Sequence, residues 1–200
     1  DVDSGASDVI FEENYWIGHV NTSPKIPHIL TYCHEGPWQN VDNRIWGLDL
    51  NTGKNWMIRP GPQGERVGHE YWFADGENIG YHGRSLDGEP FYGSIRYDNT
   101  KLVEAPFPHD STHFHSNDLR LIVGDGTRNQ PRLMIWRFRD GQFEGPRVVA
   151  HHRGSFQVQI THVHPRFSPD GSQILYVSDA SGYGNLYLVD TPVFEDLPKG

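Results

Sequence analysis

The sequence predicts an all-β fold and, within that class, a β-propeller of about four blades. The composition is rich in turn formers and aromatic residues, with 22 Gly, 14 Pro and 12% aromatic residues. No amphipathic helix of convincing length interrupts the chain. A unit of one histidine followed by alternating strands occurs four times, led by His19, His69, His113 and His162. Their spacings of 50, 44 and 49 residues fit the period of about 40 to 50 residues typical of propeller blades.

Size, charge and cysteine content limit the class of protein. The 200 residues are enough for a sizeable core. The net charge of −9 argues against nucleic acid as a partner, because no basic stripe is present to neutralise phosphates. No apolar run reaches the roughly 18 residues of a membrane span, so no membrane partner is expected. Cys33 is the only cysteine, which rules out an internal disulfide, and we expect a cytoplasmic location.

The first part of the chain predicts two blades. Residues 1–17 are expected to be a lead-in or part of an incomplete blade, and since Asp1 is not a methionine we expect residues to precede it. The first full blade is expected at 18–67, where alternating strands flank the turn Asn51-Thr52-Gly53 as in a hairpin. The second blade is expected at 68–111.

The second part of the chain predicts two more blades. The third is expected at 112–160, with one strand near 120–126 and another near 132–138. The fourth, with the C-terminal tail, is expected at 161–200. It carries Phe167-Ser168-Pro169-Asp170-Gly171, a turn that is frequent in propeller blades.

The main candidate for a metal site is the pair His162 and His164 with the nearby amide of Gln159. If residues 161–164 are extended, side chains alternate between faces, and two imidazoles and an amide can converge on one point. Imidazole suits Mn, Fe, Ni, Cu and Zn, and an amide oxygen shifts the preference towards harder ions. A surface or turn pair is the alternative, since the chain has 12 histidines.

The repeat adds two further histidines to this motif. Blade entries of a propeller lie around one mouth of the central channel, so we expect His69 and His113 close to His162 and His164. This placement favours a metal or catalytic site over scattered surface histidines.

Six separated blocks resemble the oligogalacturonate lyases, in consistent order over roughly residues 16–192. The blocks are Cys33-His34-Glu35-Gly36-Pro37, Val41-Asp42-Asn43-Arg44-Ile45-Trp46, Gly68-His69-Glu70-Tyr71-Trp72, His113-Phe114-His115-Ser116-Asn117, Val123-Gly124-Asp125-Gly126 and Gln159-Ile160-Thr161-His162-Val163-His164-Pro165. The resemblance implies a seven-bladed propeller about twice this length, of which this chain holds about four blades and lacks the N-terminal ones. It also implies β-elimination of short pectin-derived oligogalacturonates, such as di- and trigalacturonate, with bound manganese.

The resemblance assigns roles to six residues. It implies that His69 is the general base and that Arg44 assists at the substrate carboxylate. The implied manganese ligands are His113, Gln159, His162 and His164. The same ligands could bind another divalent metal. A cation on the uronate carboxylate would neutralise it and take up the developing enolate charge, and a neutral imidazole can accept the proton.

Several alternatives stand beside this hypothesis. A propeller that resembles TolB would only bind a partner and would need no metal. A hydrolase is disfavoured, because no pair of carboxylates is placed to flank a glycosidic bond. Arg44 could instead stack on Trp46 or pair with Asp42, His69 could pack on Trp72, and His115 is the alternative to His113 as a ligand. Half a ring exposes blade edges, so a missing N-terminal half or self-association is expected.

Overall fold

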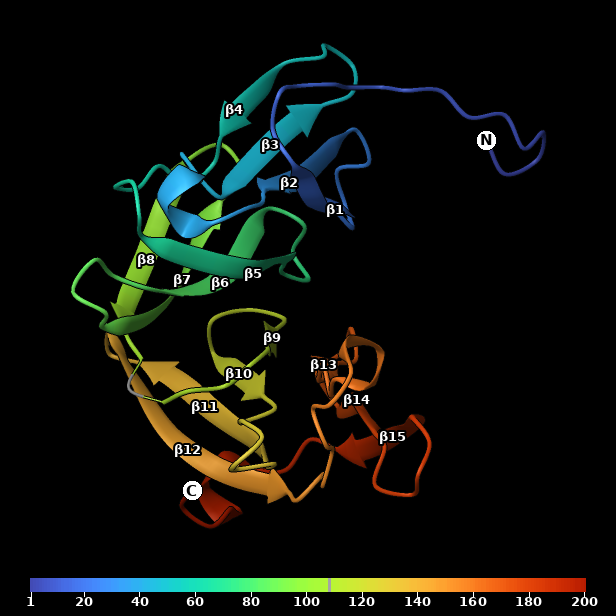
Figure 1. Cartoon of the computed structure of the whole chain (residues 1–200). Coiled ribbons are helices and arrows are strands. Elements are labelled where there is room, and N and C mark those ends of the chain that lie inside the picture. The colour runs from blue at the N-terminus through green and yellow to red at the C-terminus, as the bar shows by residue number, and fades with distance from the viewer. Residues whose placement is uncertain (108) are drawn as a thin grey trace.

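The computed structural model describes residues 1–107 and 109–200 and shows four antiparallel sheets in chain order (Figure 1). Residue 108, inside the second predicted blade, lies outside the described part. The strands are β1 (Ile17–Thr22), β2 (Ile29–His34), β3 (Ile45–Asp49), β4 (Asn55–Met57), β5 (Arg66–Trp72), β6 (Asn78–Arg84), β7 (Pro90–Arg96), β8 (Thr100–Pro106), β9 (Phe114–Ser116), β10 (Leu121–Gly124), β11 (Leu133–Arg139), β12 (Gln142–Ala150), β13 (Arg166–Phe167), β14 (Gln173–Ser178) and β15 (Asn185–Asp190). The all-β propeller architecture predicted from the sequence is confirmed.

Each sheet joins strands that follow one another in the chain. The orders are β1-β2-β3-β4, β5-β6-β7-β8, β9-β10-β11-β12 and β13-β14-β15. The predicted hairpin around residues 51–53 is confirmed, since Trp46 pairs with Met57 and Leu48 with Asn55. Gly53 has a φ of 69°, a left-handed conformation that glycine adopts without strain, and this closes the turn.

Helical structure in the described residues consists of three single 3₁₀ turns. These are η1 (Trp38–Asn40), η2 (Gln159–Thr161) and η3 (Phe194–Asp196). Among those residues, no helix has the length and apolar character needed to cross a membrane.

Three apolar clusters hold neighbouring sheets together. The first lies between the β1–β4 and β5–β8 sheets and includes Ile45, Ile79 and Tyr81, all fully buried. The second joins the β5–β8 and β9–β12 sheets around Trp136. The third joins the β9–β12 and β13–β15 sheets, with Ile174 at its centre. Burial of these faces fixes how each sheet lies on the next, as in other packed sheets.

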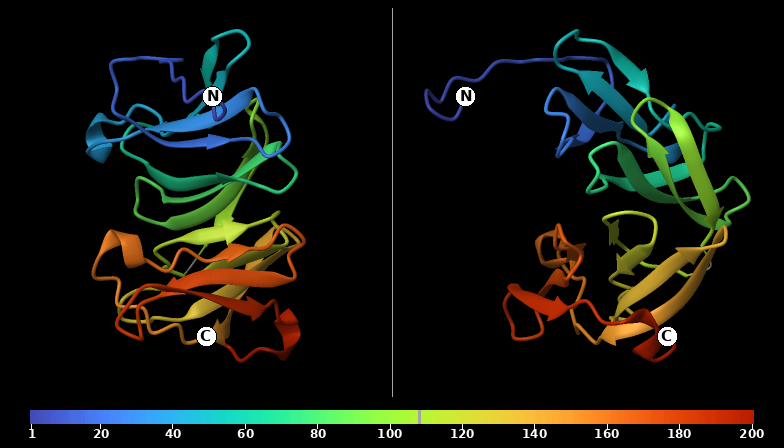
Figure 2. Two further views of the ribbon diagram at one scale, coloured as in Figure 1. Left: turned by 90° about the vertical axis from the view of Figure 1, so that its right-hand side faces the viewer. Right: turned by 180° about the vertical axis from the view of Figure 1, so that it is seen from behind.

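The four sheets follow one another along an arc, with their first strands on its inner side (Figures 1 and 2). β1 contacts β5, and β9 contacts β13, so the inner strands of successive sheets are neighbours. Side chains at the start of each sheet therefore face a common space, although they are about 50 residues apart in the chain.

Two of the inner strands carry a bulge at a histidine. The register of β1 shifts between Gly18 and Asn21, and that of β5 shifts between Gly68 and Tyr71. His19 and His69, inside these bulges, have left-handed φ values of 48° and 51°. A bulge turns the side chain away from the regular alternation of a strand, and bulges are frequent beside active sites.

Candidate active site

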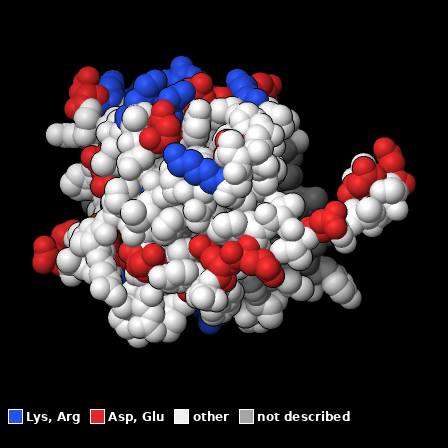
Figure 3. Space-filling view, turned by 90° about the horizontal axis from the view of Figure 1, so that it is seen from above, with Lys and Arg blue, Asp and Glu red and all other residues white. Residues whose placement is uncertain are grey.

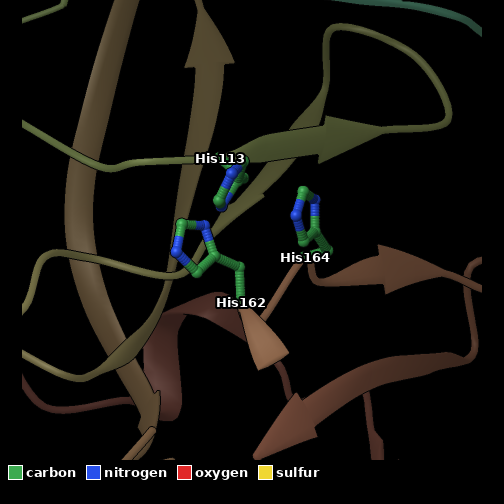
Figure 4. Close-up of side chains that lie close together, drawn as sticks. All are labelled: His113, His162 and His164. Carbon is green, nitrogen blue, oxygen red and sulfur yellow. The ribbon is translucent and has the colours of Figure 1, made fainter. Parts of the chain in front are cut away.

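Three histidines converge at the inner ends of the third and fourth sheets (Figure 4). His113 directly precedes β9, while His162 and His164 lie between η2 and β13. One ring nitrogen from each lies within 4.8 Å of those of the other two. The ring centroids of His113 and His164 are 3.7 Å apart, and those of His113 and His162 are 5.4 Å apart. We call these three residues the histidine triad.

Asp125 fixes the orientation of His113. The imidazole Nδ1–H donates to Asp125 Oδ2 at 2.6 Å, and the backbone N–H donates to Oδ1 at 2.8 Å. Ser111 Oγ donates to the same carboxylate at 3.0 Å, and Asp125 is completely buried. Because Nδ1 carries the proton, Nε2 of His113 has a free lone pair, as in many metal-bound histidines.

The other two members of the triad also fit a bound cation. Nδ1 of His162 is buried and has no hydrogen-bond partner among the described residues. A buried polar atom without a partner is uncommon, and a cation would satisfy such a lone pair. Burial, and then the charge of His113, lower the pKa of His164 to about 4, so this imidazole is neutral near pH 7 and can act as a ligand.

Residues 161–164, whose extended form was the condition for side-chain alternation, are not extended throughout: His162 is extended, but Thr161 lies in a 3₁₀ turn. Residues 159–161 form the 3₁₀ turn η2, and His164 has a left-handed φ of 42°. Hydrogen bonds from Thr161 to the carbonyl of Val158 stabilise this turn. The two histidines therefore meet through a turn and a left-handed residue, and not through strand alternation.

Gln159 belongs to the predicted ligand set, and His115 is the predicted alternative to His113. Gln159 begins η2 and is exposed, and its assignment as a ligand stays a prediction. His115 is not part of the triad. Its ring stacks on Tyr71, and its Nδ1 accepts the backbone N–H of Phe167 at 3.2 Å. Burial, and then the charge of Arg166, lower the pKa of His115 to about 3.

His69 lies beside the triad, with its ring centroid 4.9 Å from that of His113. Its Nδ1 lies 2.9 Å from Nε2 of His82, on the neighbouring strand β6. Burial, and then the charge of His113, lower the pKa of His69 to about 4, so the imidazole is in its proton-accepting form near pH 7. The structure thus places the predicted base against the predicted ligands.

Arg44 is almost completely buried just before β3 and is surrounded by acceptors. Its Nη1 and Nη2 donate to the two oxygens of Glu35 at 2.9 and 3.1 Å, and its Nε donates to the fully buried Glu70 at 3.4 Å. The remaining donors face the carbonyl of His34 and the ring of His19. All five N–H donors of the guanidinium are therefore directed at protein acceptors.

The predicted alternatives for Arg44 name the wrong partners. The guanidinium lies over the ring of Trp38, 5.6 Å from its centroid, and not over Trp46. Asp42 instead binds Nδ1 of His34 at 2.7 Å, and Trp46 stacks on the same imidazole. Trp72, the alternative neighbour of His69, belongs to the first apolar cluster.

Two cavities meet at His69. The larger, about 540 Å³, is also lined by Trp38, Arg44, Arg66 and His82. The smaller, about 220 Å³, is also lined by two members of the triad, His113 and His164. A ligand that fills both would pass His69 and touch the triad.

Charge is unevenly distributed around this region. Arg44, Arg66 and Arg84 all line the larger cavity. In the view from above, Lys and Arg side chains gather along one edge, whereas acidic side chains are spread over the face and the N-terminal extension (Figure 3). Glu35 and Asp110 also line the larger cavity and pair with Arg44 and Arg84, which leaves Arg66 as the lining arginine without an ion pair among the described residues.

Sequence reasoning missed three features of this site: Asp125 behind His113, His82 behind His69, and the carboxylates of Glu35 and Glu70 on Arg44. Asp125, Glu35 and Glu70 stand in the blocks quoted above, but their positions in the sequence do not show which side chains they contact. Asp125 and Glu35 directly follow strands β10 and β2, whereas Glu70 lies inside β5 and His82 inside β6.

The fold and the site define a β-propeller with a cluster of metal-compatible histidines beside a further, neutral histidine. A family description for oligogalacturonate lyase matches residues 1–194, and the chain belongs to this family. It is 30% identical to an oligogalacturonide lyase of Pectobacterium atrosepticum over 216 residues, and 30% identical to an oligogalacturonate lyase of Dickeya dadantii over 217 residues. Each alignment covers 96% of this chain and 54% of the relative, so the chain spans about half their length.

Solved structures agree with this assignment. An oligogalacturonate lyase in complex with manganese superposes with a TM-score of 0.79 at 31% identity, over 96% of this chain and 53% of that one. The Vibrio parahaemolyticus oligogalacturonate lyase gives 0.81 at 27% identity, over the same shares. TolB from Acinetobacter baumannii gives 0.63 at 17% identity, over 99% of this chain and 46% of that one, which shows a shared fold only.

Proposed function

We propose that this chain carries the metal ligands and the base of a lyase that cleaves short oligogalacturonates by β-elimination. The observation that carries this proposal is the contact between His69 and the histidine triad, at 4.9 Å between the rings of His69 and His113. Membership of the oligogalacturonate lyase family supports the substrate class. The chain spans about half the length of its relatives. The activity is therefore proposed either for this chain by itself or for a longer protein in which further blades complete the propeller.

His113, His162 and His164 would hold the metal, with Gln159 as a proposed fourth ligand. Manganese is the proposed ion, since a related enzyme was solved in complex with it. When bound, it would supply a Lewis acid that neutralises the carboxylate of the uronate and withdraws charge from it. Three neutral imidazoles and one amide leave the cation its full positive charge, which suits this role.

His69 would remove the proton α to the uronate carboxylate. The C–H electrons form the double bond between C4 and C5, and the 4-linked sugar leaves with the electrons of the C4–O bond. The lowered pKa of His69 keeps the imidazole unprotonated, so that its lone pair is available. The site's contact with both cavities would let the sugar chain extend on either side of the reacting carbon.

Arg44 and Arg66, two of the three arginines that line the larger cavity, would have different roles. Arg44 is saturated by Glu35, Glu70, His34 and His19, so it could bind a substrate carboxylate only by exchanging Glu35, which lies at the cavity wall. Arg66 is exposed and lines the same cavity, and no ion pair engages it among the described residues. We propose Arg66 as the more accessible cationic contact for a second uronate.

The test is to follow the ultraviolet absorbance of unsaturated uronate with di- and trigalacturonate, with manganese and with a chelator. Wild type should show a metal-dependent rise, and His69→Ala should lose it while keeping its metal. His151→Ala, at an exposed histidine that lines neither of the two cavities, is the matched control and should match wild type. Near-normal turnover by metal-loaded His69→Ala would remove His69 as the base. The same assay on any longer natural protein that contains this chain separates a wrong function from missing blades.

A further inference from the structure

Among the described residues, His82 is the one side chain within hydrogen-bond distance of the ring of His69. It lies on β6, where its Cα partner on β5 is Gly68, the residue before His69. Its Nε2 is 2.9 Å from Nδ1 of His69, and the two rings are parallel within 6° with centroids 5.1 Å apart. The opposite side of His82 packs edge-on against Phe114 at 4.8 Å.

The contact between the two imidazoles constrains where the proton of His69 lies. Two nitrogens at 2.9 Å share a single hydrogen, so one ring donates and the other accepts. If His82 donates, the proton of neutral His69 is on Nε2, and that nitrogen has no lone pair. If His69 donates, Nε2 is free to accept a proton. Only the second arrangement is compatible with His69 as a base acting through Nε2.

The backbone adds a second constraint on His69. His69 has a left-handed φ of 51° and lies in the β5 bulge. Its side chain therefore does not follow the regular alternation between the two faces of the sheet. The ring is therefore held from two sides, by the bulge and by His82. Phe114 in turn limits the movement of His82, because their rings are in direct contact.

We propose that His82 is a positioning residue that accepts the Nδ1–H of His69 and so keeps Nε2 free for the substrate proton. This inference rests on the proposed function, in which His69 is the base. The role assigned to His82 is this hydrogen bond, although His82 also lines the larger cavity. When His69 becomes protonated, the same Nδ1–H continues to donate to His82, so no rearrangement is needed.

The first test reads the tautomer directly and needs no activity. Long-range proton–nitrogen NMR of isotope-labelled histidine distinguishes Nδ1–H from Nε2–H, and His69→Gln assigns the signals. Wild type should show His69 protonated on Nδ1. His82→Phe, which can still pack against Phe114, should shift it towards Nε2–H, the form that neutral imidazole prefers in water. An Nε2–H signal for His69 in wild type would overturn the proposal.

The second test separates positioning from packing through kinetics. His82→Phe should lower kcat about 10- to 100-fold, the usual effect of losing an outer hydrogen-bond partner, with KM nearly unchanged. His82→Gln retains an acceptor oxygen and should recover most of kcat. Unchanged kcat in His82→Phe, or no recovery in folded His82→Gln, would contradict the proposal. If wild type and the longer natural protein that contains this chain are both inactive, the proposed function fails, and the NMR result still decides the tautomer.

Discussion

The carboxylate of Asp125 accepts two hydrogen bonds from His113, one from its ring and one from its backbone. The two residues are 12 positions apart, at the start of β9 and just after β10. Backbone and ring are therefore fixed by a single buried group. The position of His113 in the triad depends on a residue that itself lies outside it.

Replacing Asp125 should weaken metal binding without removing a ligand. In Asp125→Asn an NH₂ group replaces one of the two oxygens that accept hydrogen bonds from His113. We therefore expect manganese affinity to fall about 10- to 100-fold. Isothermal titration of the metal-free protein measures this. Asp118→Asn, at an exposed aspartate that pairs with Arg120, is the control and should bind as wild type does. Equal affinities for Asp125→Asn and wild type would show that the carboxylate does not support the site.

Removing a triad histidine should abolish metal binding but leave the fold intact. His162 is partly exposed and lies in a connection between sheets, so His162→Ala should unfold with a midpoint close to that of metal-free wild type. Wild type should gain about 2.7 kcal/mol of stability at a free manganese concentration about 100-fold above Kd, and His162→Ala should gain almost none. Metal analysis and thermal melts check both expectations. An unchanged metal content would take His162 out of the ligand set.

Arg44 should matter for stability as well as for activity. Arg44→Met leaves the carboxylate of Glu70 buried without its cationic partner, and removing one member of a buried ion pair costs about 3 to 5 kcal/mol. Glu35 is partly exposed, so Glu35→Gln should lose clearly less. Urea unfolding of the two variants provides the comparison. A smaller loss in Arg44→Met than in Glu35→Gln would mean that Glu70 does not rely on the guanidinium.

Arg66 should affect substrate binding and not the chemical step. Arg66→Ala is expected to raise KM for trigalacturonate, more at low than at high salt, with kcat little changed, since an exposed cation contributes mainly to binding an anion. Arg120→Ala, which removes an exposed arginine elsewhere, controls for net charge. A fall in kcat at constant KM would place Arg66 in the chemistry instead.

His115 should make the protein sensitive to acid. Burial lowers its pKa from 6.5 to about 3, so the unfolded chain binds the proton more readily than the folded one. This group's contribution to stability is complete above pH 6.5 and is lost progressively as the pH falls from there towards 3. His115→Gln, which can still accept the N–H of Phe167, should therefore show a shallower loss of unfolding free energy between these values. Urea titrations at several pH values test this, and parallel curves for both proteins would refute it.

The repeat of leading histidines was sufficient to predict the blades, because hydrophobic alternation and turn residues are local signals that each sheet repeats. It also predicted that His69, His113, His162 and His164 meet, since first strands of blades share the inner side of the arc. What the sequence could not show was how they meet. That depends on the bulge at His69, the turn η2 and the left-handed backbone of His164, none of which follows from the alternation of apolar and polar residues.

The partners of the functional residues were hidden for a related reason. The pairs His113–Asp125, His69–His82 and Arg44–Glu70 are formed across neighbouring strands or sheets. Pairing register decides which side chains oppose each other, and bulges shift that register by a residue. No spacing along the chain encodes such pairs in advance.

The triad takes His113 from the third sheet and His162 and His164 from the entry to the fourth. A cation held there would join two sheets that already meet through apolar packing around Ile174 and through hydrogen bonds such as the one from Asn117 Nδ2 to the carbonyl of Ser168. Hydrogen exchange in β9 and β13 should then slow when metal is added. Conversely, a substitution that creates a cavity in the packing around Ile174 should lower the affinity for the ion, although it removes no nitrogen ligand.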